Sequence, residues 1–457
     1  MIQHHGVDCT LDAKLSRLQE KASKTLIIPY HKANLSEPEI QELANNLQES
    51  CDCDVQHLPF TKTFILTYKD KNGIMVERLT LPAGAVLRHD KFVNISFHGD
   101  YRDIVKIASS DVKMDPGYHL QWAFQDLSNN ADINADKAWE IYQSDGIGGN
   151  ARSLDPRQKY LAGAIIAVVD TGIDYNHPDL KDVMWTNPGE IPGNGIDDDD
   201  NGIIDDFHGA DFSDTEPKGD PMDDNGHGTH CAGIIAAKAN NGDGVRGVAS
   251  FVKGKVKVMA IKFADKNGRL LIQSNVVKAM EYLLANGADV SSHSYSIEDT
   301  YDEDLYNILE TNEYHLAVAA SGNSGRVIDA KSRITPCALG AKNTMCVASS
   351  TNENTRSPFS NVGKEIVDVF APGSHILSTY LNADYKYMWG TSMATPYVSG
   401  LAALVKSMRV RLSGKEVKNL IVKNVNQMDQ YRHLVTSEGL IDMAKTISAT
   451  RKRKISG

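Results

Sequence analysis

The sequence predicts an α/β protein built on a doubly wound, mostly parallel sheet with helices on both faces. From Asp115 onward, short apolar runs alternate with longer segments whose apolar residues recur at helical spacing. The runs at 164–169 and 345–348 are apolar almost throughout, as expected of strands buried on both faces. Parallel strands need crossover connections, and the helical segments supply them.

The individual elements follow in chain order. We expect strands at 164–169, 256–261, 288–292, 317–320 and 345–348, and helices at 227–239, 274–286 and 392–408. Functional residues of such sheets gather at the carboxyl ends of the strands. Asp170 directly follows the first of these strands, so it is the first candidate for a functional side chain.

A smaller unit precedes this region. Residues 25–30 are strand-like, 37–50 have apolar residues at helical spacing, and 61–68 alternate strongly. This pattern predicts a compact α+β domain. We therefore divide the chain into an extension (1–23), a small domain (24–110), a main domain (115–445) and a basic C-terminal tail (446–457).

Composition limits the classes of function. With 457 residues, 41% of them hydrophobic, the chain has the make-up of an ordinary globular protein, and no apolar run approaches the ~18 residues of a membrane span. A net charge of −11 argues against a nucleic-acid partner. The first residues show no apolar core of a secretory signal. Six cysteines are too few for a disulfide scaffold. Cys337 and Cys346 could pair, but two separate buried thiols are favoured.

Three distant segments carry a catalytic pattern. They are Val168–Gly172, Asn225–His230 and Gly390–Pro396, and they supply Asp170, His227 and Ser392 in that order. A serine hydroxyl becomes a nucleophile when an imidazole takes its proton, and a fixed carboxylate orients that imidazole. A helix start at Ser392 would also direct backbone N–H groups toward a developing oxyanion.

Each residue also has an ordinary structural explanation. A serine at a helix start is commonly an N-cap, a histidine among glycines is commonly structural, and an aspartate after a strand commonly caps a turn. The three long motifs occur together and in one order, which favours catalysis. A catalytically silent scaffold or binding protein is the alternative.

These motifs resemble those of the subtilisin family of serine endopeptidases. The similarity runs from about residue 115 to 442 and includes His177–Leu180, Phe359–Asn361 and Ala371–Gly373. The resemblance implies a subtilisin-like fold and endopeptidase activity. It also implies that Asn323, in the segment Ala319–Ser324, donates its side-chain amide to the oxyanion.

The resemblance further implies that substrate binds as an added strand between two segments of this chain. The cleft residues it implies are Arg269, Leu270, Leu271, Ser294, Tyr295, Ser296, Ala320, Ser321 and Gly322. Leu271 and Ser296 stand where the family commonly has glycine, so we expect a narrower cleft and a restricted sequence preference. His293 is unusual beside this segment and is expected to be a packed wall residue.

The small domain resembles, weakly in sequence, the ferredoxin-like propeptide of the same family. This implies an intramolecular inhibitor and chaperone, released by self-cleavage between about Ile107 and Asp115. A permanent regulatory domain is the alternative. The resemblance also implies protein or peptide substrates, a secretory location and a monomer.

An acidic stretch at 194–206 predicts a Ca²⁺ site. Asp197, Asp199 and Asn201 stand at positions 1, 3 and 5 of a calcium-loop pattern, and Gly202 stands at position 6. Position 12 is His208, so Asp205 or Asp206 must close the site. A solvated acidic loop without an ion is the alternative.

The family resemblance implies a second Ca²⁺ site. Asp179 matches a family ligand, and the loop at 240–245, with Asn241, resembles the partner loop of that ligand. Asp115 resembles an N-terminal ligand of the thermitase-like branch.

Overall fold

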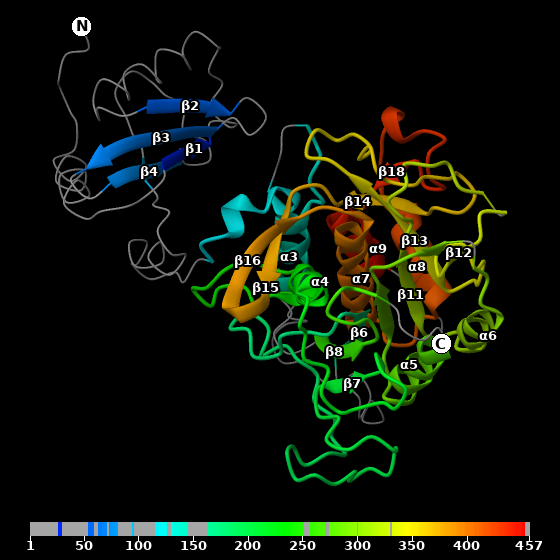
Figure 1. Ribbon diagram of the computed structural model, residues 1–457. Coiled ribbons are helices and arrows are strands. Elements are labelled where there is room, and N and C mark those ends of the chain that lie inside the picture. The colour runs from blue at the N-terminus through cyan, green and yellow to red at the C-terminus, as the bar shows by residue number, and fades with distance from the viewer. Residues whose placement is uncertain are drawn as a thin grey trace, which may run out of the picture. The chain divides into compact units, whose positions relative to one another are not determined.

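The computed structural model (Figure 1) describes residues 115–125, 129–144, 163–250, 256–269, 274–298, 300–329 and 331–452, and the backbone of strands before residue 96. The chain divides into two compact units, Met1–Lys113 and Met114–Gly457. Each unit is described by itself.

The first unit contains an antiparallel sheet. Its strands are β1 (Leu26–Pro29), β2 (Asp54–Leu58), β3 (Thr63–Asp70), β4 (Gly73–Thr80) and β5 (Asn94–Ile95). Strand β3 pairs with β1, β2 and β4. The predicted strands at 25–30 and 61–68 correspond to β1 and β3, whereas the predicted helix at 37–50 lies outside the described residues.

The second unit is organised around a nine-stranded sheet, in the order β17-β18-β14-β13-β11-β9-β6-β8-β7. The strands are β6 (Ala164–Asp170), β7 (Gly209–Asp211), β8 (Val256–Lys262), β9 (Val290–His293), β11 (Leu316–Ala320), β13 (Thr344–Ser350), β14 (Val369–Pro372), β17 (Asn426–Gln427) and β18 (Gly439–Leu440). Neighbouring strands are parallel apart from the antiparallel pair β17–β18. The predicted strands are therefore present.

Helices cover both faces of this sheet (Figure 1). One apolar core includes residues of α3 (Ala135–Ser144), α4 (His227–Ala236), α7 (Thr391–Met408), α8 (Gly414–Lys423) and α9 (Met443–Lys452). A second core, on the opposite face, includes residues of α5 (Ser274–Ala285) and α6 (Glu303–Thr311). The prediction of a doubly wound α/β fold is confirmed.

Shorter elements complete the unit. The hairpin of β15 (Ile376–Tyr380) and β16 (Asp384–Met388) and the pair β10 (Ile297–Glu298) and β12 (Ile334–Thr335) stand apart from the large sheet. Single 3₁₀ turns lie at Tyr118–Leu120, Trp122–Phe124, Leu381–Ala383 and Asp429–Tyr431. Among the described residues, no helix is long and apolar enough to cross a membrane.

The order of the strands places β6 at a switch point. From β6 the chain passes to β7 and β8 on one side and then returns to β9 on the other side. At such a point the two flanking connections run in opposite directions and open a crevice at the carboxyl ends of the strands. Asp170, the last residue of β6, lies at this crevice.

Two expectations need correction. The basic tail was expected from residue 446, but residues 446–452 belong to helix α9, in which Thr446, Ile447 and Thr450 are buried. Cys337 and Cys346 were expected to be separate thiols, but they form a disulfide. The chain after β12 returns beside β13 and brings the two Cα atoms to 4.9 Å, a separation that a disulfide can bridge.

Candidate active site

Asp170 and His227 meet at the crevice. The Nδ1 atom of His227, the first residue of α4, lies 2.7 Å from Oδ1 of Asp170. Burial by itself lowers the pKa of His227, but the charge and hydrogen bond of Asp170, together with the interactions with Cys231, outweigh it, and the pKa is raised well above its usual value. Because a carboxylate accepts only, Nδ1 carries the proton and Nε2 keeps its lone pair in the neutral ring.

A buried carboxylate that sequence reasoning missed links the two residues. Asp223 accepts hydrogen bonds from the Thr171 hydroxyl (2.9 Å) and from the Gly226 amide (3.0 Å). It also accepts from the amide (3.0 Å) and hydroxyl (2.7 Å) of Thr229. One side chain therefore ties the loop after β6 to the first turn of α4. The only sequence signal is an aspartate four positions before His227.

Ser392 lies in the first turn of α7. Its hydroxyl donates to the carbonyl of Ser294 at 2.8 Å, and its own carbonyl accepts from the Ser294 hydroxyl at 2.9 Å. Among the described residues no hydrogen bond joins Ser392 to His227. In proteins without bound substrate, catalytic hydrogen bonds are often long and tighten when substrate binds.

Asn323 lies beside Ser392. Its Oδ1 accepts from the amide and the hydroxyl of Thr391, each at 2.9 Å, which fixes the orientation of the side-chain amide. A Cβ placed on Gly390 would lie 3.5 Å from the Ser392 nitrogen and 3.6 Å from Asn323 Nδ2. The two donors therefore border one small space, and glycine, at φ +152°, leaves this space open.

The predicted cleft segments lie close to this space. A Cβ on Gly322 would lie 3.2 Å from the Ser296 hydroxyl, so the segments 294–296 and 320–322 approach each other. Ala320 and Ser321 are buried, and Tyr295 and Ser296 are half-buried. Arg269 is exposed on a tight turn with Asp265 (Arg269 amide to Asp265 Oδ1, 2.9 Å), whereas Leu270 and Leu271 lie outside the described residues.

Comparisons with known proteins agree with this geometry. The family model described as Subtilase family matches residues 162–440, more than half of the chain. The chain belongs to the subtilase family. Members of this family are serine proteases, which are hydrolases. The predictions of a subtilisin-like family and of a serine-type hydrolase are confirmed.

Individual relatives are similar over the same region. Subtilisin-like protease 1 of Plasmodium berghei is 33% identical over 62% of this chain and 49% of its own length. Thermitase of Thermoactinomyces vulgaris is 32% identical over 65% of this chain and 86% of its own length. A protease structure from Pseudoalteromonas arctica PAMC 21717 shares the fold, with a TM-score of 0.55 at 23% identity, over 75% of this chain and 100% of that one.

The matched stretch thus spans about half the length of the Plasmodium berghei relative, 49%.

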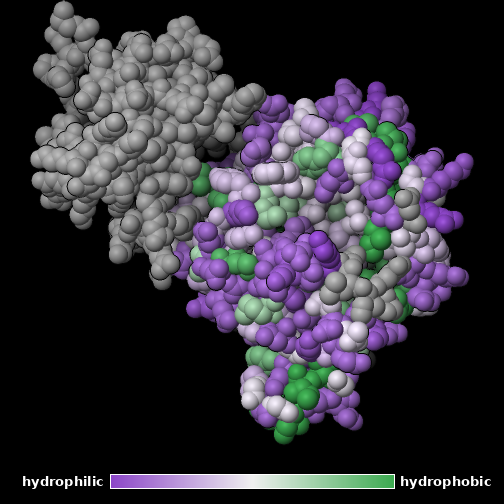
Figure 2. Space-filling model, viewed as in Figure 1, coloured by the Kyte–Doolittle hydropathy of each residue, from purple (hydrophilic) through white to green (hydrophobic). Residues whose placement is uncertain are grey.

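The acidic loop of this subtilase, between β6 and β7, extends away from the sheet (Figure 1). It exposes Ile191, Ile196 and Ile204 among polar side chains (Figure 2). Glu190, Asp199 and Asp206 each place a carboxylate oxygen within 4.8 Å of the others. Asn187 joins two of them, donating to Asp199 at 2.9 Å and to Asp206 at 3.0 Å.

The predicted ligands of this loop divide into two groups. Asp199 and Asp206 belong to the carboxylate cluster, and Asn201 donates its side-chain amide to Asp206 at 3.1 Å. Asp197 instead accepts from the amide of Gly202 at 2.7 Å, and Asp205 accepts from the amide of Gly193 at 2.7 Å. These two side chains therefore hold the loop backbone.

Glu190 was missed because it lies before the calcium-loop pattern. Its Oε1 accepts from the amide of Asp198 at 2.9 Å. Its Oε2 is buried and accepts no hydrogen bond from any described residue. A buried anionic oxygen without a partner, next to two further carboxylates, fits a hard cation such as Ca²⁺.

The residues predicted for a second calcium site lie together. Asp179 accepts from the side-chain amide of Asn241 at 2.6 Å, and Asp115 accepts from the Asn241 backbone amide at 3.0 Å. Burial raises the pKa of Asp179 to about 6. Sequence reasoning missed Arg246, whose Nε donates to Asp115 at 2.6 Å and whose guanidinium lies 4.0 Å from the centre of the Tyr118 ring.

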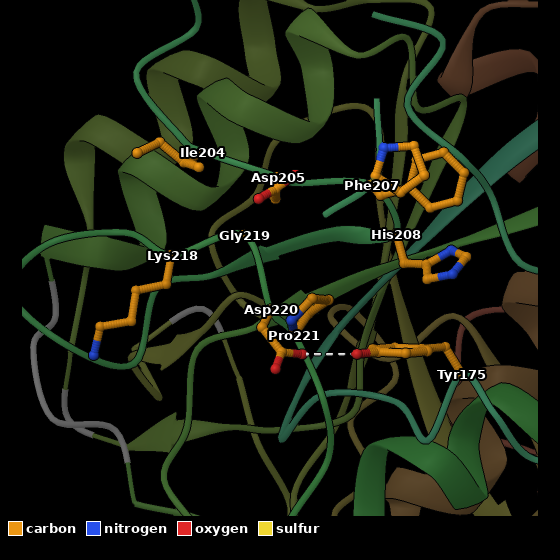
Figure 3. Close-up of a pocket in the computed structure, with 10 residues that line it drawn as sticks. Tyr175, Ile204, Asp205, Phe207, His208, Lys218, Gly219, Asp220 and Pro221 are labelled. Atoms are coloured by element: carbon orange, nitrogen blue, oxygen red, sulfur yellow. Dashed lines mark hydrogen bonds between the residues drawn. The ribbon is translucent and has the colours of Figure 1, made fainter. Parts of the chain in front are cut away.

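A surface pocket of about 400 Å³ lies beside the acidic loop (Figure 3). The Tyr175 ring is tilted against that of His208, with centroids 4.7 Å apart, and its hydroxyl donates to Asp220 at 3.0 Å. Pro192, Ile204 and Lys218 are among the other lining residues. None of the predicted catalytic residues is among its lining residues, so it lies apart from the candidate active site.

Proposed function

We propose that this subtilase is a calcium-stabilised serine endopeptidase, made as a self-cleaving zymogen. The observation that carries the proposal is the convergence of Asp170, His227, Ser392 and Asn323 at one crevice of the sheet. A silent scaffold is disfavoured because all four catalytic residues are present and their partners hold them in place.

The mechanism follows from the hydrogen-bond directions. Asp170 holds the Nδ1 proton of His227 and so directs the Nε2 lone pair toward the nucleophile. When substrate binds, the Ser392 hydroxyl turns from the Ser294 carbonyl to Nε2, and His227 takes its proton as Oγ attacks the scissile carbonyl carbon. Asp170 stabilises the imidazolium that forms.

Charge then develops on the carbonyl oxygen. The Ser392 backbone N–H and the Asn323 Nδ2 group donate to it, because both border the same space over Gly390. The C–N bond breaks as His227 returns its proton to the leaving amine, which leaves an acyl group on Ser392. Water, deprotonated by His227, then hydrolyses this ester and regenerates the serine.

In the acidic loop, calcium would be held by Glu190, Asp199 and Asp206. At the second site, it would be held by Asp115 and Asp179. A bound cation would supply countercharge to the buried carboxylates and order the loop. This role is structural and takes no part in bond cleavage.

The first unit would act as propeptide: an inhibitor and chaperone of the second unit, cleaved near the boundary at residues 113 and 114. The natural substrates of the mature enzyme would be proteins or peptides. We expect a restricted sequence preference, because Ser296 stands where the family commonly has glycine and its hydroxyl lies close to Gly322. The Cys337–Cys346 disulfide supports an oxidising, secretory location. We expect the mature enzyme to be a monomer.

Replacement of Ser392 by alanine tests the catalytic assignment. We expect peptide turnover to fall by about 10⁶-fold, since removal of this nucleophile in subtilisin has an effect of that order. Fluorophosphonate labelling should disappear, and the purified chain should stay at full length while wild type splits near residue 110. These are measured by peptide hydrolysis, active-site labelling and mass spectrometry.

Ser399→Ala is the matched control, because Ser399 is a buried serine of the same helix that bonds Ser292 at 2.9 Å. It should keep both activity and labelling. Undiminished turnover in Ser392→Ala would overturn the assignment. A labelled, active wild type that never splits would instead identify the first unit as a permanent domain.

A further inference from the structure

A chain of buried polar side chains runs beneath one wall of the substrate cleft. Ser291, His293 and His315 are 0%, 0% and 3% exposed. The Ser291 hydroxyl oxygen lies 2.7 Å from His293 Nε2 and 2.8 Å from His315 Nε2. We call this series of hydrogen-bonded side chains the relay. At one end His315 Nδ1 lies 2.8 Å from the Ala288 carbonyl, and at the other His293 Nδ1 lies 3.0 Å from the Tyr295 hydroxyl.

The chemistry of the two ends fixes the direction of every hydrogen bond. A carbonyl only accepts, so His315 carries its proton on Nδ1, and its Nε2 must accept from the Ser291 hydroxyl. Ser291 then accepts from Nε2–H of His293. His293 Nδ1 is left with a lone pair, which accepts the proton of the Tyr295 hydroxyl. Every polar atom of the relay thus has a partner.

The relay lies on the sheet face opposite α7. Successive residues of a strand point to opposite faces. Ser292 bonds Ser399 of α7 at 2.9 Å, so Ser291 and His293 face the other side, where α5 and α6 pack. The relay also crosses from β9 to the residue before β11, and these strands lead to the cleft segments 294–296 and 320–323.

Stability does not account for this arrangement. Both histidines are neutral, since burial lowers the pKa of His293 to about 3 and that of His315 to about 4. Apolar side chains of similar size would fill the same space without a desolvation cost. What a satisfied buried network adds is a unique orientation of the groups it joins. The one member of this network that reaches the surface is Tyr295, which is half-buried.

We propose that the Ser291–His293–His315 relay is a positioning device that fixes the Tyr295 ring as a specificity-determining wall of the substrate cleft. This inference rests on the proposed function. The carbonyl of Ser294, the neighbour of Tyr295, accepts from the Ser392 hydroxyl, so Tyr295 follows directly after a residue that contacts the proposed nucleophile. Its ring packs on Phe263, with centroids 4.5 Å apart. Phe263 is buried and supports the Tyr295 ring, whose exposed part is suited to an apolar or aromatic substrate side chain on the acyl side of the scissile bond.

The relay limits how this surface can adapt. Rotation of the Tyr295 ring away from the wall would leave His293 Nδ1 buried without a donor, which is costly. The wall therefore keeps one shape instead of adjusting to each side chain. Residues of the relay do not touch the reacting atoms, so the effect should fall on substrate selection and KM, with kcat little changed.

Two substitutions test the relay. Each variant is produced as the full chain and assayed after it has cleaved itself. Tyr295→Phe removes the hydroxyl and keeps the ring, and His293→Leu removes the middle of the relay. With a peptide library varied on the acyl side, each should reduce the preference for apolar over polar side chains by up to about tenfold, as expected for one lost hydrogen bond. The change should appear in KM.

The double variant Tyr295→Phe/His293→Leu distinguishes positioning from general damage. Both substitutions break the same hydrogen bond, so their effects on selectivity should not add. Ser292→Ala is the matched control, since it lies on the same strand with the same burial and faces α7. It should leave selectivity unchanged. Additive effects, or a profile unchanged by Tyr295→Phe, would overturn the proposal.

A spectroscopic measurement does not depend on peptidase activity. With ¹⁵N-labelled histidine, NMR at neutral pH should show His315 as the Nδ1–H tautomer and His293 as the Nε2–H tautomer. Any other pair of tautomers contradicts the relay. A wild-type protein that shows these tautomers but cleaves no peptide would contradict the proposed function and leave the relay's geometry supported.

Discussion

Two acidic clusters of this subtilase differ in how their charge is balanced. Asp115 pairs with the buried guanidinium of Arg246, at 2.6 Å, beside the buried Asp179. In the acidic loop, Glu190, Asp199 and Asp206 approach within 4.8 Å, and no lysine or arginine among the described residues forms an ion pair with them.

The difference indicates where an external cation matters. Buried carboxylates require countercharge, and the first cluster obtains part of it from the chain itself. The second cluster has hydrogen-bond donors, Asn187 and Asn201, but no lysine or arginine of the described residues pairs with it. We therefore expect dependence on calcium to be concentrated in the acidic loop.

The largest effect is expected from removal of the internal cation. Arg246→Met leaves Asp115 buried without its partner, a change that typically costs about 3–5 kcal/mol. Calcium should restore part of this stability, because the cluster then depends on an external cation. Thermal unfolding with and without Ca²⁺ measures both effects.

Lys406→Met is the control for this experiment, because Lys406 is 1% exposed and lies near Asp289 instead. It should destabilise the protein without changing the response to calcium. If calcium stabilises Arg246→Met no more than it stabilises the control, Asp115 and Asp179 do not form a calcium site.

A smaller effect is expected from Glu190→Gln. Calcium at about 100 times its dissociation constant adds about 2.7 kcal/mol of stability for one site. Removal of one anionic ligand should abolish most of this gain at the acidic loop. Asp198→Asn is the matched control, since this exposed carboxylate holds the Ile191 amide at 3.0 Å outside the cluster. Calorimetry of calcium binding should show a lost site in Glu190→Gln and an unchanged one in the control.

The sequence indicates the positions of the proposed catalytic residues more clearly than those of the proposed metal ligands, for a physical reason. Asp170, His227 and Ser392 each lie within a long motif and at the end of a regular element, so the strand and helix pattern already places them. The acidic loop has no such elements. There, side chains with the same chemistry, Asp197 and Asp199, take different roles because the backbone turns decide which oxygen meets an amide.

Other residues could not be found from spacing. Arg246 lies 131 positions from Asp115, and their pairing depends on the tertiary fold. Asp223 is close to His227 in sequence. Its hydrogen bond to Thr171, however, joins the loop after β6 to the start of α4, and these two segments are distant in sequence. The histidine relay likewise combines residues of β9 with one before β11.

The relay offers a third way to bury a titratable group, which is to keep it neutral. Its effect on stability is the smallest of the three at neutral pH and grows as the pH falls. The pKa of a histidine is about 6.5 in the unfolded chain, whereas it is about 3 for His293 and about 4 for His315 in the folded protein. Between these values the unfolded chain binds protons that the folded protein does not. Stability is therefore complete above pH 6.5 and is lost as the pH falls toward 4.

Two such groups give a slope of up to about 2.7 kcal/mol per pH unit. Denaturant unfolding from pH 7 to pH 4 should therefore show a shallower acid limb for His293→Leu/His315→Leu than for wild type. The raised pKa of His227 acts in the opposite sense, but it is common to both proteins and cancels in the comparison. His433→Gln, at an exposed position, is the control and should keep the wild-type slope. An equal slope in the double variant would show that these histidines are already charged in the folded protein, and that the neutral relay is wrong.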